Sequence, residues 1–224
     1  IVGGGLAGAA AAQALARQGW ACTVLERLGG PAQGASGNPG GVYHGAVHPD
    51  DGPHARWLRS AALLAHRRYG PWIRSGRVRG LADGLVQLGA RLPPTPWPAT
   101  YVSAWDTATV QEACGVPAPQ GGLHYTAAGW VDPRDLVTAW LDHPAVRCIA
   151  HAQVGGCALV PSPAPKHGDA TPPPRWAVRS AAGEVLGEAS LVVWATGAAL
   201  PQLPRGVPGP TVLSLIHISE PTRR

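Results

Sequence analysis

The chain opens with Ile1-Val2-Gly3-Gly4-Gly5-Leu6-Ala7-Gly8, in which three glycines have the spacing G-x-G-x-x-G. An apolar strand before such a turn and a helix after it, here Ala7 to Ala16, form the start of a βαβ unit. The first glycine allows a tight turn, the second lets backbone approach a pyrophosphate, and the third lets the helix pack on the strand. The stretch predicts a phosphate-binding turn at the amino end of a helix. The alternative is a glycine-rich turn before an ordinary helix.

A second apolar run, Cys22-Thr-Val-Leu25, ends in Glu26, eighteen residues after Gly8. An acidic residue at this place in a dinucleotide-binding unit accepts hydrogen bonds from ribose hydroxyls. Gly19 lies where the intervening helix should end, because glycine is favoured just past a helix C-terminus. The spacing predicts an α/β, Rossmann-like fold that holds a dinucleotide. The predicted contacts are Gly3, Gly5, Leu6, Ala7, Gly8, Glu26 and Arg27.

Two further stretches fit a cofactor site. The apolar run Leu191-Val-Val-Trp194 predicts a buried strand, and Ala195-Thr196-Gly197 follows it with side chains too small to collide with a cofactor. The alternative there is an ordinary strand end. Directly after the Glu26 strand comes a glycine-rich loop, where backbone amides and the Ser36 hydroxyl can approach a flat anionic ligand. The alternative is a flexible surface turn. Predicted contacts in the loop are Ala35, Ser36, Gly37, Asn38, Gly40 and Gly41.

Together with Gly129-Trp-Val-Asp-Pro133, these motifs resemble the D-amino-acid-oxidase-like flavoprotein superfamily. Within it they resemble the FAD-dependent oxidoreductase domains of bifunctional enzymes of tRNA 5-methylaminomethyl-2-thiouridine biosynthesis. The resemblance covers residues 1 to about 212 and implies FAD as cofactor, with backbone of Val154 near adenine. It also implies a discontinuous FAD-binding domain of the glutathione-reductase type, residues 1–69 and 143–212. An inserted, incomplete α+β substrate domain would occupy residues 70–142.

The resemblance implies a function in tRNA modification in the cytoplasm. In that family the domain oxidatively removes the carboxymethyl group from 5-carboxymethylaminomethyl-(2-thio)uridine at the tRNA wobble position, and a separate methyltransferase domain then acts. The implied partners are a tRNA substrate and a fused or partner methyltransferase domain. Two alternatives stay open: an FAD-dependent oxidase of free glycine or D-amino acids, and a non-catalytic fragment. No catalytic residue is predicted, because much of the substrate site in this superfamily comes from a later part of the domain.

Composition limits the possible classes of protein but does not identify a function. The 224 residues include 18 Lys and Arg against 13 Asp and Glu, a net charge of +5. A mildly basic balance suits RNA but is common among other enzymes. No stretch has the apolar length of a membrane span.

The four cysteines form no C-x-x-C pair, so free thiols are predicted, with Cys22 and Cys148 buried. His44 and His48 follow the glycine loop, but Gly45 and Pro49 argue against a helical metal-binding pair, and no metal is predicted.

Elsewhere the sequence predicts helices at residues 53–69 and 107–114 and a third helix after Asp132, with Pro133 at its first position. Asp51 is the expected cap of the first of these helices, whose buried stripe would include Trp57 and Leu64. Strands are predicted at residues 85–88 and 146–149, followed by an antiparallel meander from residues 154–160, 176–179 and 184–186. Residues 161–175 read as a mobile insertion between two of these strands.

The sequence predicts that neither end of the chain is the natural end of the protein. The sequence contains no Met and begins inside a predicted strand, which predicts a cut on the N-terminal side. Residues 213–224 resemble the translation of a sequencing-library adapter and are left out of the fold prediction. The alternative is a genuine, divergent C-terminus.

Overall fold

The computed structural model describes residues 1–160 and 175–197, which belong to two compact units. The first unit comprises residues 1–36 and the part of the chain from residue 140 onward, and the second comprises residues 37–139. The predicted adapter-like tail at 213–224 and nearly all of the predicted insertion at 161–175 lie outside the described residues. The predicted division into an FAD-binding domain, residues 1–69 and 143–212, and a partial substrate domain, residues 70–142, stays a prediction.

The first unit is built on a parallel arrangement of strands. Strand β1 (Cys22–Leu25) pairs in parallel with β8 (Val146–Ile149), and the backbone of Val2 bridges Leu25 on one side and Trp194 on the other, again in parallel. Helix α1 (Leu6–Ala16) connects the first strand segment to β1. Ala12 of this helix is fully buried against Cys22 and Val24, because its small side chain lets the helix lie close to the strands.

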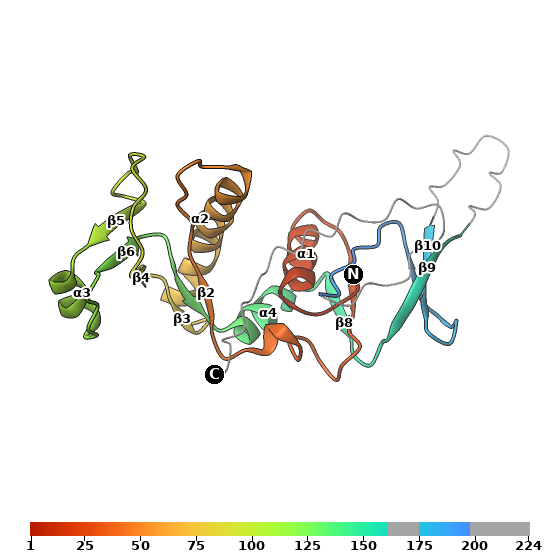
Figure 1. Cartoon of the computed structure of the whole chain (residues 1–224). Helices are drawn as coiled ribbons and strands as arrows, with labels where there is room; N and C mark the ends of the chain where they lie inside the picture. The colour runs from red at the N-terminus through yellow and green to blue at the C-terminus, as the bar shows by residue number, and fades with distance from the viewer. Residues whose placement is uncertain (161–174, 198–224) are drawn as a thin grey trace, which may run out of the picture. The chain divides into compact units, whose positions relative to one another are not determined.

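A three-stranded antiparallel sheet completes the described part of this unit. Its order is β11 (Val185–Ala189), β10 (Arg175–Ser180) and β9 (Val154–Val160), and β9 and β10 run side by side in Figure 1. Val178 of β10 packs in one core cluster with Val2 and Leu25 of the parallel strands. The predicted meander is therefore present, and its apolar face joins the core of the parallel sheet.

The second unit contains two small antiparallel sheets. One has the order β2 (Gly41–Tyr43), β7 (Gly129–Val131) and β3 (Gly80–Leu81), and the other has the order β4 (Leu85–Leu88), β6 (Gly122–Tyr125) and β5 (Val102–Trp105). Val102, Leu123, Tyr125 and Ala128 form a buried cluster on the second of these sheets. Helix α3 (Thr107–Cys114) follows β5 and is capped by Asp106, whose Oδ1 accepts a hydrogen bond from Thr109 N at 2.8 Å.

Helices α4 and α2 show which helix ends the sequence predicts correctly. Helix α4 (Pro133–Leu141) begins where predicted, since Oδ1 of Asp132 accepts the N–H of Arg134 at 2.8 Å. Helix α2 (Pro53–Arg74) extends five residues past its predicted end at Tyr69 and contains Pro71. No helix among the described residues is long and apolar enough to cross a membrane.

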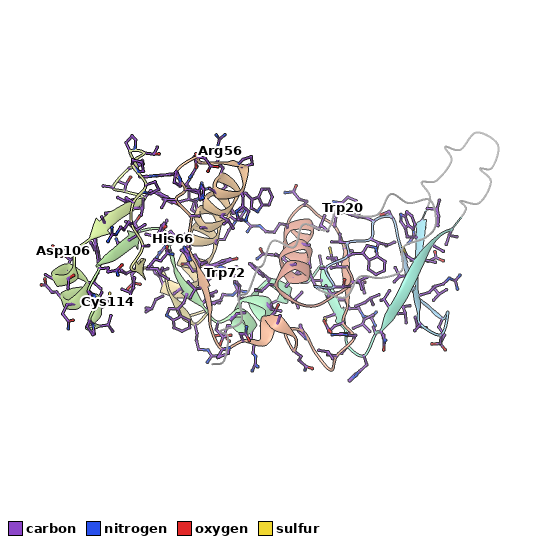
Figure 2. The ribbon with its side chains drawn as sticks, viewed as in Figure 1. Trp20, Arg56, His66, Trp72, Asp106 and Cys114 are labelled. Atoms are coloured by element: carbon purple, nitrogen blue, oxygen red, sulfur yellow. The ribbon has the colours of Figure 1, made fainter. Side chains whose placement is uncertain are left out.

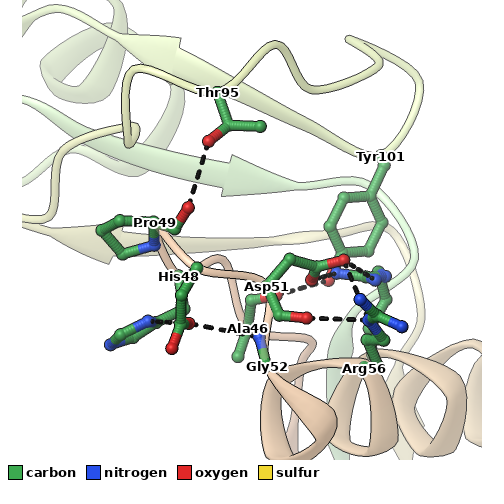
Figure 3. A network of polar contacts seen from close by, with 10 residues as sticks. Ala46, His48, Pro49, Asp51, Gly52, Arg56, Thr95 and Tyr101 are labelled. Atoms are coloured by element: carbon green, nitrogen blue, oxygen red, sulfur yellow. Dashed lines mark hydrogen bonds and ion pairs between the residues drawn. The ribbon is translucent and has the colours of Figure 1, made fainter.

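Three predictions about burial and capping are wrong. Gly52, not Asp51, is the N-cap residue of α2, because the Asp51 carboxylate binds Arg59. Figure 3 labels Asp51 and Gly52 at this end of the helix. Trp57 and Leu64 are about half exposed, because α2 turns Ala55 and Ala62 inward instead. Cys148 is exposed, since only β1 pairs with its strand within the described part of the chain. The four thiols are free, and Cys22 is buried as predicted.

Candidate cofactor-binding site

The glycine turn joins Val2 to α1 with almost no room for side chains. Gly3 has φ +104°, in the left-handed region that favours glycine, and its N–H donates to Leu25 O at 2.8 Å. A Cβ on Gly3 would collide with the Ala195 carbonyl oxygen, and a Cβ on Gly8 would collide with the Gly3 carbonyl oxygen. These two glycines therefore let the first strand, α1 and the 195–197 segment meet at backbone distance.

The amino end of α1 is open to an anion. Its N-cap residue, Gly5, has no side chain, and the Leu6 N–H donates to Ser36 Oγ at 3.0 Å. The N–H groups of Ala7 and Gly8 have no acceptor within the described part of the chain. Free N–H groups and the helix dipole together favour a phosphate at such an end.

Ser36 brings the glycine-rich loop to this helix end. It lies in a short 3₁₀ helix, η1 (Ala35–Gly37), and its Oγ is 2.9 Å from where a Cβ on Gly5 would be. The space left by the missing Gly5 side chain is thus occupied by the serine hydroxyl. Because that hydroxyl accepts from Leu6 N, its own hydrogen remains available to donate to a phosphate oxygen.

Glu26 lies at the end of β1, and its side chain faces the turn. The residue is 7% exposed; its Oε2 accepts the Gly4 N–H at 2.7 Å and its Oε1 accepts the Leu28 N–H at 2.9 Å. A carboxylate offers about four lone-pair positions, so both oxygens retain capacity for a ribose hydroxyl. The two backbone bonds also fix the direction of the carboxylate. The donor set of the turn and this acid fits a diphosphate and a ribose.

Sequence reasoning missed Gly4 and Ala32. Gly4 binds Glu26 through its N–H, and its carbonyl accepts the Ala32 N–H at 3.0 Å. A Cβ on Gly4 would lie 3.1 Å from Glu26 Oε2 and 3.2 Å from the Pro31 Cβ. Gly4 occupies an unspecified position of the G-x-G-x-x-G pattern, so only the run of three consecutive glycines signals it. Ala32 is buried with φ +56°, which nothing in the local sequence indicates.

The Ala-Thr-Gly segment meets the glycine turn. Ala195 N donates to Val2 O, and Val2 N donates to Val193 O, each at 2.8 Å. Leu191 is exposed and Val192 to Trp194 are only partly buried, and the run pairs through a single bridge between Trp194 and Val2, so the predicted buried strand is not formed as a regular strand. Gly197 has φ +66°, and Thr196 follows Ala195 beside Gly3. The two strongest motifs of the sequence, at opposite ends of the described chain, therefore form one surface.

The remaining predicted contacts are placed as follows. Arg27 is exposed directly after Glu26, and Val154 begins β9 with its side chain against the core of the first unit. Gly37, Asn38, Gly40 and Gly41 belong to the second unit, where Gly41 pairs with Val131 in the β2–β7 ladder. A role of these residues in holding a cofactor stays a prediction.

The two loop histidines have local partners. His44 Nδ1 is 2.7 Å from Gly45 O, and its ring packs against that of Tyr125 with centroids 5.4 Å apart. His48 contacts the carboxylate of Asp50 (Figure 3). Residues 1–160 and 175–197 contain no group of three or more His, Cys, Asp or Glu side chains placed to hold a metal ion.

Sequence comparisons show which known proteins the chain resembles. A protein from Methylibium petroleiphilum named tRNA 5-methylaminomethyl-2-thiouridine biosynthesis bifunctional protein MnmC is 43% identical over 144 residues, which is 60% of this chain and 22% of the relative. Its namesake from Polaromonas sp. is 34% identical over 220 residues, 94% of this chain and 32% of the relative. The chain thus spans about a third or less of the length of these relatives.

The fold also matches solved structures of oxidases. The crystal structure of glycine oxidase from Geobacillus kaustophilus superimposes with a TM-score of 0.54 at 17% identity, covering 88% of this chain and 54% of that one. The family model described as FAD dependent oxidoreductase, DAO, matches residues 1–223. The chain has an α/β fold of this type, and it belongs to the DAO family of FAD-dependent oxidoreductases, whose cofactor is FAD.

Proposed function

We propose that this chain is part of an enzyme that modifies the wobble uridine of tRNA. The reaction is FAD-dependent oxidation of a CH–NH bond of 5-carboxymethylaminomethyl-(2-thio)uridine to an imine. Water then hydrolyses the imine, which releases the carboxymethyl group as a two-carbon oxo acid and leaves the aminomethyl nucleoside. The observation that carries the proposal is 34% identity over 94% of the chain to a protein of tRNA 5-methylaminomethyl-2-thiouridine biosynthesis. Because that relative is bifunctional by name, a fused or partner methyltransferase domain is part of the proposal.

The residues of the glycine turn would bind and orient the cofactor. The Ala7 and Gly8 N–H groups and the Ser36 hydroxyl would hold the diphosphate, and Glu26 would accept from the ribose. FAD, when bound, supplies the acceptor for the hydride that leaves the carbon next to the substrate amine. Arg27, Val154 and the loop residues Gly37 to Gly41 would contact the rest of the cofactor. Residues 70–142 would contribute an incomplete substrate domain to the same enzyme.

The direct test uses the full-length, FAD-loaded protein and tRNA that carries the 5-carboxymethylaminomethyl group. After incubation the tRNA is digested and its nucleosides are separated by liquid chromatography and mass spectrometry. We expect the carboxymethyl nucleoside to be replaced by its aminomethyl counterpart. Glycine and D-alanine, offered without RNA, serve as the comparison. Oxidation of the free amino acids together with unchanged tRNA would contradict the proposal and favour an amino acid oxidase.

A further inference from the structure

Helix α2 and the turn after it form the most basic stretch of the chain. Residues 52–82 contain no Asp or Glu, although the whole chain has 13 of these acids, and they contain seven of its 18 basic residues. The seven are Arg56, Arg59, Arg67, Arg68, Arg74, Arg77 and Arg79. Such a concentration of one sign of charge attracts a polyanion.

Ion pairs occupy the arginines at both ends of this stretch, Arg56 and Arg59 at its start and Arg79, which binds Asp132 and Asp135, at its end. Asp51 binds Arg59 through two hydrogen bonds of 2.8 and 3.1 Å, and its carboxylate is 3.4 Å from Arg56 Nε. Arg59 also lies over the Trp97 ring, 5.0 Å from its centroid. These contacts fix Arg59 within the fold, so it is not available to a partner. The charge that remains available lies toward the middle of the helix.

Arg67 and Arg68 are exposed and have no acidic partner within the described part of the chain. They stand three and four residues after Leu64, so they flank it on the helix surface. Trp57 lies seven residues before Leu64, two turns away on the same side. Trp57 is 51% exposed and Leu64 is 50% exposed. We call Trp57, Leu64, Arg67 and Arg68 the α2 outer face. Figure 2 draws the side chains of this helix and labels Arg56, His66 and Trp72 on it.

The chemistry of the α2 outer face fits single-stranded RNA. Arginine binds phosphate oxygens through paired hydrogen bonds, and an exposed tryptophan offers a ring on which an unpaired base can stack. Trp57 and Arg67 are separated by about 15 Å along the helix axis, so the two kinds of contact would reach different nucleotides. A membrane-bound helix would need a continuous apolar face, whereas this face has two large apolar side chains and adjoining arginines.

We propose that the α2 outer face binds the single-stranded loop of tRNA that carries the wobble base. Arg67 and Arg68 hold backbone phosphates, and Trp57 stacks on an unpaired base. This inference rests on the proposed function, because it identifies where the tRNA substrate of that enzyme is held. Phosphate contacts of this kind fix the position of the RNA and carry no sequence information.

The test compares two double variants of the full-length, FAD-loaded protein. Arg67→Gln/Arg68→Gln removes two charges from the α2 outer face, and Arg91→Gln/Arg147→Gln removes two exposed charges elsewhere. Binding of tRNA is measured by fluorescence anisotropy from low to high salt. We expect the first variant alone to bind tRNA at least about tenfold more weakly at low salt. The slope of log K against log salt should become less steep by about 1.4. The reason is that each phosphate contact to a single strand contributes about 0.7 to the slope, and this variant loses two contacts.

A third variant separates stacking from charge. Trp57→Ala should weaken tRNA binding by about 5- to 150-fold, with the salt slope unchanged, since stacking involves no ion release. In turnover assays both the Arg67→Gln/Arg68→Gln and Trp57→Ala variants should raise KM for tRNA and leave kcat unchanged. Turnover of the free modified nucleoside should also stay as in the wild type.

Three results would overturn the inference. The first is wild-type affinity and salt slope in Arg67→Gln/Arg68→Gln while the wild type binds and modifies tRNA. The second is protection of Trp57 from an aqueous quencher in the RNA-free full-length protein, which would show that the polypeptide itself covers the face. The third is an Arg67→Gln/Arg68→Gln variant that no longer binds anionic lipid vesicles but still binds tRNA as the wild type does, which would show that the face binds a membrane. A wild type that neither binds nor modifies tRNA would instead refute the proposed function.

Discussion

At the residue scale, Glu26 links the fold to the cofactor site. Its carboxylate accepts the Gly4 and Leu28 N–H groups, so it holds the glycine turn as well as facing the predicted ribose. Its place at the end of a strand was predictable from the distance to Gly8. The hydrogen bond to Gly4 was not, because the spacing of a motif says nothing about which backbone groups a buried carboxylate satisfies.

We expect Glu26→Gln to weaken FAD binding by at least about tenfold, because a hydrogen bond to a charged group contributes about 1.5–3 kcal/mol. The amide would also leave one backbone N–H without an acceptor, so the apoprotein should lose stability as well. Titration of the full-length apoprotein with FAD, followed by flavin fluorescence, measures the first effect, and urea unfolding measures the second. Glu112→Gln, on exposed α3, is the matched control. Equal FAD affinity in both variants would contradict the ribose assignment.

We expect Gly8→Ala to destabilise the protein, although Gly8 lies in a helix. Alanine gains about 1 kcal/mol of helix propensity over glycine. The new Cβ would collide with the Gly3 carbonyl oxygen, and such overpacking costs about 1–3 kcal/mol. The free energy of unfolding should therefore fall, as measured by urea denaturation. Gly187→Ala, where a Cβ meets open space, is the control. A Gly8→Ala protein more stable than this control would show that the turn is not packed as described.

At the element scale, α2 shows why a correct helix can be placed with the wrong side inward. Its sequence has an apolar stripe through Trp57 and Leu64 and another of small residues through Ala55 and Ala62. Periodicity finds the helix but cannot choose between two such stripes. The small residues are buried, because they allow the backbone to approach its neighbours closely. Gly70 and Pro71 read as a helix end in sequence, yet the helix continues to Arg74.

Elements with local signals were predicted closely. Asp106 and Gly115 mark both ends of α3, and Asp132 with Pro133 marks the start of α4. Asp51 gave a false signal, because a carboxylate before a helix can bind either the helix N–H groups or nearby arginines. Only the tertiary structure brings Arg59 into reach and decides between them.

The ion pairs at the start of α4 predict how the stability of the protein depends on pH. Arg79 binds Asp135 at 2.7 Å and Asp132 at 2.6 Å, and its hydrogen bond to Asp135 lowers the pKa of that carboxyl. A lowered folded-state pKa adds stability above the unfolded value, about 3.9, and the gain is lost as pH falls through the folded value. Arg79→Gln should therefore have a lower Tm than the wild type at pH 7. The difference in Tm between the two proteins should narrow below about pH 4. A difference that widens on acidification would contradict the ion pair between Arg79 and Asp135.

At the scale of the whole molecule, the parallel strands and the meander bring both ends of the described chain to one site. The α/β class was predictable, because each motif depends on backbone features that few residues provide. The two compact units were harder to predict, since their boundaries at residues 36 and 140 fall inside the glycine-rich loop and inside α4. The first boundary has the Gly- and Pro-rich composition of a linker, but the same loop is predicted to belong to the cofactor site, and the second boundary has no such composition.

We expect residues 1–224 alone to hold FAD poorly and to show no turnover. The chain spans 22% and 32% of the two relatives compared above, so a large part of such a protein, with its buried surface and ligand contacts, would be absent. The flavin content of the purified polypeptide, read from its visible absorbance against protein concentration, measures this. Full-length protein prepared in parallel is the control. A yellow, fully flavin-loaded and active preparation of residues 1–224 would refute the prediction.

The most direct measurement is a crystal structure of the full-length protein with FAD bound. The account predicts the diphosphate at the amino end of α1, within hydrogen-bond distance of the Ala7 and Gly8 N–H groups. It also predicts the adenosine ribose on the Glu26 carboxylate. Density for the diphosphate elsewhere, or a ribose with no contact to Glu26, would contradict it.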